Sequence, residues 1–122
     1  MTRYCKDLGR SGEQMAAQHL AASGHIIVET NFTTRFAEID IIAAIDDCLV
    51  FVEVKTRTSA KKGLPREAVT ASKQKKIILA AKQYIKTRAL DGQKRIRFDV
   101  MEIFFTDDTC HITHIPHAFF SE

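Results

Sequence analysis

Two segments of the chain alternate apolar and charged residues with the period of a β-strand. They are AEIDII at residues 37–42 and VFVEVKTR at residues 50–57. Between them, Asp46 and Asp47 are residues that suit a tight turn. The pattern therefore predicts two neighbouring strands joined as an antiparallel hairpin.

The two-residue period of a strand assigns each side chain to a face. In the first segment one face is predicted to carry Glu38, Asp40 and Ile42, opposite Ala37, Ile39 and Ile41. In the second segment one face combines apolar and charged residues, in the order Leu49, Phe51, Glu53, Lys55 and Arg57. Its opposite face consists of Val50, Val52, Val54 and Thr56. Each strand is thus expected to be apolar on one side and charged at one end of the other.

Asp40, Glu53 and Lys55 interrupt runs that otherwise indicate buried strands. Burying such groups costs free energy unless they are paired or bind a cation. Neighbouring strands lie about 4.8 Å apart, so a suitable register brings the two carboxylates around one ion. Mg²⁺ prefers such oxygen ligands, and a lysine beside it can stabilise the charge that develops in phosphoryl transfer. The alternative is an exposed pair of Glu53 and Lys55 on a half-solvated sheet, with Asp40 as a surface acid.

The remaining segments predict the rest of an α/β fold. A helix is expected over residues 11–23, ended by Gly24 in a left-handed cap, and a strand over residues 25–31. A basic loop over residues 58–65 precedes a long helix over residues 66–90, which Asp91 and Gly92 close. Two last strands are expected over residues 95–105 and 109–115. The long helix should return the chain to a strand parallel to the third one. The order αβββαβ with a final strand indicates a mixed central sheet flanked by helices, in one domain over residues 1–122.

Asp40, followed by Glu53-Val54-Lys55, resembles the D…ExK signature of the PD-(D/E)XK superfamily of restriction-endonuclease-like nucleases. The fuller pattern resembles the YraN family of small bacterial proteins, in the Holliday-junction-resolvase-like branch. The likeness covers nearly the whole chain and rests on GEQMAAQHL at 12–20, Asn31-Phe32, AEIDIIA at 37–43, FVEVKTR at 51–57, Gly63, Pro65, Ala68-Val69, Lys73, Ala81, Tyr84 and FDV at 98–100. It implies a restriction-endonuclease-like αβββαβ core, in agreement with the predicted order of elements.

The resemblance implies that Asp40 and Glu53 are ligands of Mg²⁺ or Mn²⁺ and that Lys55 is the catalytic lysine. The family usually has glycine where this chain has Ala37, which restricts the backbone there but leaves the implied ligands unchanged.

The resemblance also implies that the first helix supplies an acid to the metal and the reaction, at Glu13. Glu13, Ala17 and Leu20 follow the i, i+4, i+7 spacing of one helix face, which places Glu13 on the side that packs on the sheet. The alternative is a glutamate that stabilises the N-terminus of the helix.

Five further residues are candidates for auxiliary roles: Glu38, Arg57, Lys73, Gln74 and Asp99. Glu38 can reach the ion, a substrate or solvent, and Arg57 suits a phosphate contact or a salt bridge. Asp99, on a predicted central strand, needs partners and is expected to brace Lys55 or an arginine, or to hydrogen-bond a loop. Lys73 and Gln74 lie near the start of the long helix, where the superfamily often has an active-site helper.

The formal net charge of +3 permits nucleic-acid binding without requiring it. The candidate phosphate contacts are Lys61, Lys62, Arg66 and Lys76, since lysine and arginine contacts dominate nonspecific affinity. A solvated helix face is the alternative for most lysines of the long helix.

Cys5, Cys48 and Cys110 are isolated in sequence, which predicts reduced thiols in a cytoplasmic protein. No apolar stretch approaches the roughly 20 residues of a membrane span, so no membrane partner is expected. The run CHITHIPH at 110–117 invites a zinc site, but strand alternation places His111 and His114 on opposite faces, which disfavours it.

These observations favour a metal-dependent endonuclease that acts on structured or branched DNA. The alternative is a noncatalytic nucleic-acid-binding module that acts with a partner protein. The sequence leaves open whether the nucleic acid is DNA or RNA, and it allows a homodimer.

Overall fold

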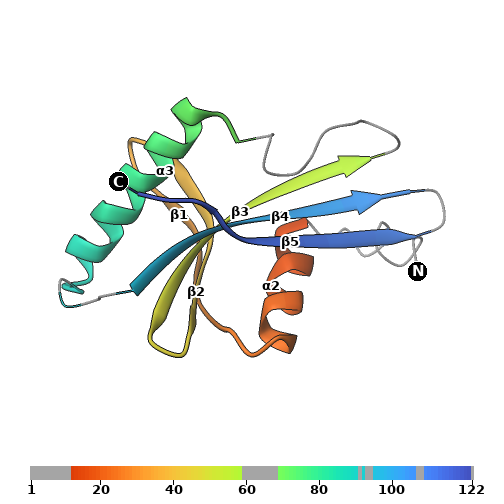
Figure 1. Ribbon diagram of the computed structural model, residues 1–122, viewed down its shortest axis with the longest axis horizontal. Helices are drawn as coiled ribbons and strands as arrows, with labels where there is room; N and C mark the ends of the chain where they lie inside the picture. Colours follow the sequence, from red (N-terminus) through yellow and green to blue (C-terminus); the bar gives the residue numbers. More distant parts are fainter. Residues whose placement is uncertain (1–11, 59–68, 91, 93–94, 107–108, 122) are drawn as a thin grey trace.

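The computed structural model describes residues 12–58, 69–90, 92, 95–106 and 109–121. Its elements are α2 (Gly12–Ala22), β1 (Ile26–Thr33), β2 (Glu38–Ile45), β3 (Cys48–Thr58), α3 (Ala71–Thr87), β4 (Arg95–Phe105) and β5 (Cys110–Phe119) (Figure 1). The strands form one sheet in the order β1-β2-β3-β4-β5, in which β3 and β4 pair in parallel and the other neighbours pair antiparallel. The predicted α/β class, the antiparallel meander and the parallel strand after the long helix are confirmed.

Each helix covers one face of the sheet with a separate hydrophobic layer. The α2 layer joins helix residues to alternate strand residues: Ala16, Leu20, Ile41, Val50, Val52, Met101 and Ile103. The α3 layer uses the opposite strand faces: Ile77, Ala81, Tyr84, Ile42, Leu49, Phe51, Phe98 and Val100. Because both faces of β3 are covered, any charged residue on that strand near the helices must lie at the rim of a layer or find a partner.

The predicted alternation of faces holds along β3 and fails at one point of β2. Leu49 and Phe51 lie in the α3 layer and Val50 in the α2 layer, as expected. In β2, however, Ile39 packs in the α3 layer together with Ile42, so the prediction that Ile39 shares a face with Ile41 is wrong. The irregularity is centred on Asp40.

The long helix is shorter than predicted at both ends. It begins at Ala71, because the Thr70 hydroxyl accepts the Lys73 backbone N–H at 3.1 Å and caps the first turn. It ends at Thr87, because Ala89 adopts a left-handed φ of 56° and the Leu90 N–H returns to the Ile85 carbonyl at 2.8 Å. The predicted start over residues 66–68 and Asp91 lie outside the described residues.

The other boundaries are close to those predicted. The strand over residues 95–105 is confirmed, and Gly24 ends the first helix with the expected left-handed φ of 96°. The last strand continues to Phe119 instead of ending at residue 115. A register shift between β4 and β5 and a left-handed φ of 53° at His117 carry β5 past Pro116, which an edge strand tolerates.

The cysteine prediction is only partly right. Cys48 is a buried free thiol, whereas Cys110 is disulfide-bonded. Isolated spacing carries no information on such pairing. Within the described part of the chain, no helix has both the length and the apolar composition to cross a membrane.

Gly12 sets how closely α2 approaches the sheet. A Cβ atom at this position would overlap the Oγ1 atom of Thr56 on β3 and lie 3.2 Å from the Cγ1 atom of Ile103 on β4. The absent side chain therefore lets the first turn of α2, which carries Glu13, lie against β3.

We expect Gly12→Ala to lower the free energy of unfolding by about 1–2 kcal/mol, because the added methyl group must displace Thr56 and Ile103. Urea denaturation measures the change. The matched control is Gly92→Ala, whose Cβ would meet no atom within 4 Å. Equal stability of the Gly12 variant and the wild type would show that α2 does not depend on this close approach.

Candidate active site

Asp40 lies where β2 and β3 separate. The paired residues of the two strands extend only as far as Ile41 and Val52, one step before Asp40. Beyond that point the Oδ2 atom of Asp40 accepts the backbone N–H of Val54 at 2.7 Å. The carboxylate thus satisfies a donor that the strand ladder leaves open, and this contact fixes Asp40 between the two strands.

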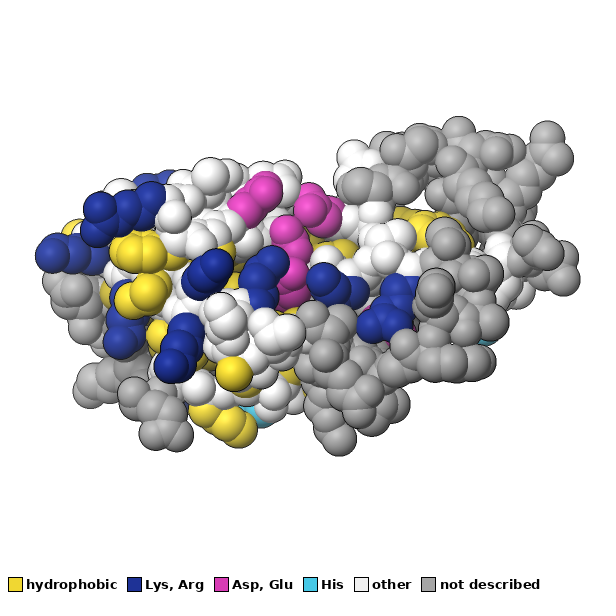
Figure 2. All heavy atoms as spheres, turned by 90° about the horizontal axis from the view of Figure 1, so that it is seen from above, with side chains coloured by type: hydrophobic (Ala, Val, Ile, Leu, Met, Phe, Trp, Pro, Cys, Tyr) yellow, Lys and Arg dark blue, Asp and Glu magenta, His cyan; other side chains and the backbone are white. Residues whose placement is uncertain are grey.

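A cavity of about 280 Å³ opens beside the separated strands. It is lined by Phe36, Ala37, Glu38, Asp40, Glu53, Lys73 and Lys76. Figure 2 shows the acidic side chains gathered near the middle of one face, with lysine and arginine side chains around them. The predicted pair of Asp40 and Glu53 therefore does line one pocket, and Glu38, Lys73 and Lys76 line it too.

Glu13 reaches the same acidic cluster from the first turn of α2. The Nδ2 atom of Asn31 donates to Glu13 Oε1 at 2.7 Å and to Glu38 Oε2 at 2.9 Å, so one amide holds two carboxylates. Asn31 has a left-handed φ of 53°, opposite the irregular part of β2. No role in the site was predicted for Asn31 from the sequence. Its signal was that asparagine tolerates the left-handed conformation better than most residues.

Negative charge accumulates around Asp40. Burial raises the pKa of the Asp40 carboxyl, and the N–H of Val54 opposes this, but the charges of Glu53 and Glu13 and a hydrogen bond to Glu13 raise it further, to about 7. Asp40 is therefore partly protonated near neutral pH. A cation bound among these acids would offset their repulsion and lower the pKa of Asp40.

Glu53 is buried, with 7% of its side chain exposed, and its Oε2 atom lies 3.5 Å from the Nζ atom of Lys73. Lys73 extends from the first turn of α3, which Thr70 caps. This contact supports the expectation that the start of the long helix serves the site. Gln74, by contrast, donates to the Val69 carbonyl at 3.0 Å and does not line the acidic cavity.

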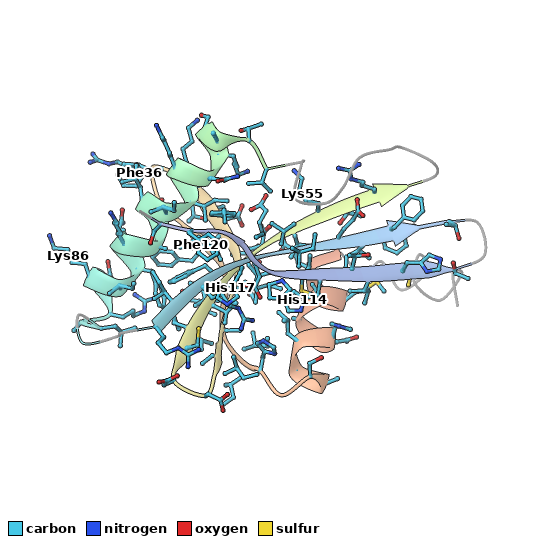
Figure 3. All side chains as sticks on the ribbon, viewed as in Figure 1. Phe36, Lys55, Lys86, His114, His117 and Phe120 are labelled. Atoms are coloured by element: carbon cyan, nitrogen blue, oxygen red, sulfur yellow. The ribbon has the colours of Figure 1, made fainter. Side chains whose placement is uncertain are left out.

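The positive residues of β3 lie outside the cavity. Lys55, labelled in Figure 3, is two residues beyond Glu53 on the same strand. It does not line the cavity and makes no ion pair with another described residue. Arg57 pairs with Glu102 of β4 at 2.6 Å, which is the salt bridge that the sequence left open. Lys55 is thus the cation of this strand without a carboxylate partner in the described part of the chain.

Asp99 has partners, but they lie on the opposite face of the sheet. It is fully buried, and its carboxylate accepts two hydrogen bonds from Arg97 at 2.8 Å and one from His114 Nε2 at 2.7 Å. The prediction that it braces an arginine is borne out, whereas Lys55 is not its partner. His114 is therefore committed to Asp99 rather than to a zinc site.

Of the predicted phosphate contacts, Lys76 lines the acidic cavity. Lys61, Lys62 and Arg66 lie outside the described residues.

The carboxylate oxygens of this site are suitable ligands for a hard cation. Within the described ranges, no three Asp, Glu, His or Cys side chains converge as a ready-made metal site. Asn31 engages Glu13 and Glu38, and Lys73 faces Glu53. Asn31 thus hydrogen-bonds, and Lys73 partly neutralises, carboxylate oxygens of the kind that Mg²⁺ and Mn²⁺ prefer. Asp40, Glu53 and Glu13 are the residues that would hold the ion.

We expect Asp40→Asn to raise the free energy of unfolding near pH 8 by on the order of 1–3 kcal/mol and to change it little near pH 4. The folded-state pKa of about 7 lies above the ordinary value of an aspartate, so the charged carboxylate costs stability as the pH rises through that range. The asparagine oxygen still accepts the Val54 N–H. Urea denaturation at both pH values measures the difference.

The matched control is Asp47→Asn, which removes an acid that is 73% exposed and paired with Arg95. Its effect should stay within about 0.5 kcal/mol at either pH. If Asp40→Asn is less stable than the wild type near pH 8, the charged Asp40 carboxylate does not cost the fold stability.

Comparison with known proteins places the chain in a family. Residues 12–103 match the model of an uncharacterised protein family, UPF0102. UPF0102 proteins of Geobacter metallireducens and Syntrophus aciditrophicus are 45% and 46% identical over 98% and 91% of this chain, and over 97% and 87% of their own lengths. A UPF0102 protein of Alkaliphilus oremlandii is 41% identical over 93% of this chain and 98% of its own. The chain therefore belongs to the UPF0102 family, which is the YraN family predicted from its motifs.

Proposed function

We propose that this protein is a metal-dependent endonuclease that hydrolyses phosphodiester bonds in structured or branched DNA, of the kind formed at Holliday junctions. The observation that carries the proposal is the meeting of Asp40 and Glu53 in one cavity at the point where β2 and β3 separate. Glu13, from another element, adds its charge to the same cluster. Like charges repel, so bringing three acids from three elements together costs free energy unless a cation or a proton offsets their charge. Such clusters therefore indicate a functional site.

The resemblance of Asp40, Glu53 and Lys55 to the D…ExK signature supports the same conclusion. Bound to the carboxylates, Mg²⁺ or Mn²⁺ would polarise a phosphoryl oxygen and lower the pKa of attacking water. Lys55, without a carboxylate partner in the described part of the chain, is available to orient that water or to stabilise charge on the phosphate. Lys73 and Lys76, on the rim of the cavity, can receive the flanking phosphates.

A noncatalytic nucleic-acid-binding module is the second candidate. The contacts that favour it are the hydrogen bonds of Asn31 to Glu13 and Glu38 and the ion pair of Lys73 with Glu53, which give these acids partners without a metal ion. In that case the lysines would bind nucleic acid and the acids would only position them.

We expect Asp40→Asn and Glu53→Gln each to weaken Mn²⁺ binding severely and to abolish cleavage of branched DNA, because each removes a ligand. Lys55→Met should leave Mn²⁺ binding and DNA binding within a few-fold of the wild type while cleavage falls by roughly two to three orders of magnitude. Calorimetric Mn²⁺ titration and a cleavage assay over branched, flapped, single-stranded and linear substrates measure these effects.

The control variant for the cleavage assay is Lys82→Met, which removes an exposed lysine from α3 outside the cavity. Equal Mn²⁺ binding by the wild type and both acid variants would contradict the metal site. DNA binding by the wild type with no cleavage of any substrate would favour the noncatalytic module.

We expect Lys76→Gln to weaken DNA binding about equally across sequences and to reduce the slope of log K against log salt by about 1, since one phosphate contact is lost. The matched control is Lys86→Gln, ten residues along α3, at the end of the helix away from the cavity (Figure 3). Fluorescence anisotropy at several salt concentrations measures both slopes. An unchanged slope for Lys76→Gln would place the phosphate track elsewhere.

A further inference from the structure

Phe36 lies in the turn between β1 and β2 and lines the same cavity as Asp40, Glu53 and Lys76. Its side chain is only partly buried. Among the described residues that pack in or against the two hydrophobic layers, Phe36 does not occur, although its neighbours Phe32 and Ala37 do. An aromatic ring that serves neither layer but borders a charged cavity needs another explanation.

The turn that carries Phe36 is held by Thr34. The Thr34 hydroxyl oxygen accepts the backbone N–H groups of Phe36 at 3.0 Å and Ala37 at 3.1 Å, and the hydroxyl donates to the Ala37 carbonyl at 2.9 Å. The Thr34 N–H also donates to the Ala37 carbonyl, at 3.0 Å. These bonds fix the backbone of Phe36 beside the cavity before any ligand arrives, which lowers the entropic cost of using the ring as a contact.

Arg35 places a positive charge beside the Phe36 ring. Its Cζ atom lies 5.0 Å from the centroid of Phe36, within the range of a cation–π contact. An aromatic ring with a guanidinium beside it suits two groups at once, a nucleobase for stacking and the adjoining phosphate for charge pairing. A nucleic acid carries this pair of groups, a flat π-face and a fixed negative charge, in every nucleotide.

We propose that Phe36 and Arg35 form a stacking platform for an unpaired nucleobase next to the phosphate that enters the acidic cavity. This inference rests on the proposed function and narrows its substrate class. Bases inside a duplex are stacked on their neighbours and expose only their edges, whereas an unpaired base presents a face on which an aromatic ring can stack. Substrates with an unpaired nucleotide at the bound phosphate, such as flaps and open junctions, are therefore bound in preference to continuous duplex.

The test uses the full chain with Ca²⁺ in place of Mg²⁺, since Ca²⁺ takes oxygen ligands too and lets a phosphate approach the acids, and a gel confirms that the probes stay intact. One probe is a DNA duplex with a single-stranded flap that carries 2-aminopurine as its first unpaired base, and the second is the fully paired duplex. We expect the wild type to bind the flap more tightly and to quench the 2-aminopurine by stacking. Phe36→Leu should lower affinity for the flap by roughly 5- to 100-fold and abolish the quenching, with duplex affinity unchanged.

Phe36→Trp provides the rescue, because it keeps a stacking ring and should retain both the preference and the quenching. Phe120→Leu is the matched control, since Phe120 is 68% exposed but does not line the acidic cavity. Equal binding of flap and duplex by the wild type, or equal losses on both probes in Phe36→Leu, would overturn the platform.

The cleavage assay separates this inference from the proposed function. If the wild type cleaves DNA but its preference for the flap does not depend on Phe36, the platform is wrong and the proposed nuclease function stands. If the preference for the flap depends on Phe36 but no substrate is cleaved, the platform is supported as a binding site and the proposed nuclease function is wrong.

Discussion

The bond from the Val54 N–H to the Asp40 carboxylate is the contact on which the rest of the site depends. At this point the ladder between β2 and β3 has ended, and a side chain takes the place of a strand carbonyl. The bond lets the two strands separate without leaving a backbone donor unpaired. The separation creates the cavity that Asp40 and Glu53 line, so the same interaction holds the fold and places the acids.

The carboxylates around that contact have weakly bound or uncharged partners. An amide from Asn31 serves both Glu13 and Glu38, and Lys73, which is 42% exposed, faces Glu53 at 3.5 Å. Glu53 is buried, but the pair is long and its lysine end is open to solvent, so the contact holds Lys73 only weakly. These partners are thus easily exchanged for a cation or for substrate phosphates. The arrangement suits a site whose carboxylates exchange their present partners for a ligand. It would contribute little to the stability of the fold on its own.

The features predicted correctly from the sequence are those that depend on the two-residue period of a strand or on the charge of single residues. The order of elements, the parallel pairing of β3 and β4, and the shared cavity of Asp40 and Glu53 follow from that information. It did not predict the turn of Ile39 into the α3 layer, because the irregular ladder at Asp40 overrides the two-residue period. It also did not predict that Ala89 would end α3, since the left-handed conformation usually favours glycine.

Two aspartates on this sheet, Asp99 fully buried and Asp40 half-buried, show how environment decides the role of a carboxylate. Asp99 pairs in register with Val52, one step from Glu53, but on the face covered by α2. Burial acts to raise the pKa of Asp99, yet the hydrogen bonds from His114 and Arg97 outweigh it and leave that pKa lowered. Asp99 is thus a charged group with all its partners supplied by the fold. Asp40 meets other acids instead, and its pKa is raised. No cation of the described residues pairs with Asp40, and this distinguishes a candidate site from a structural ion pair.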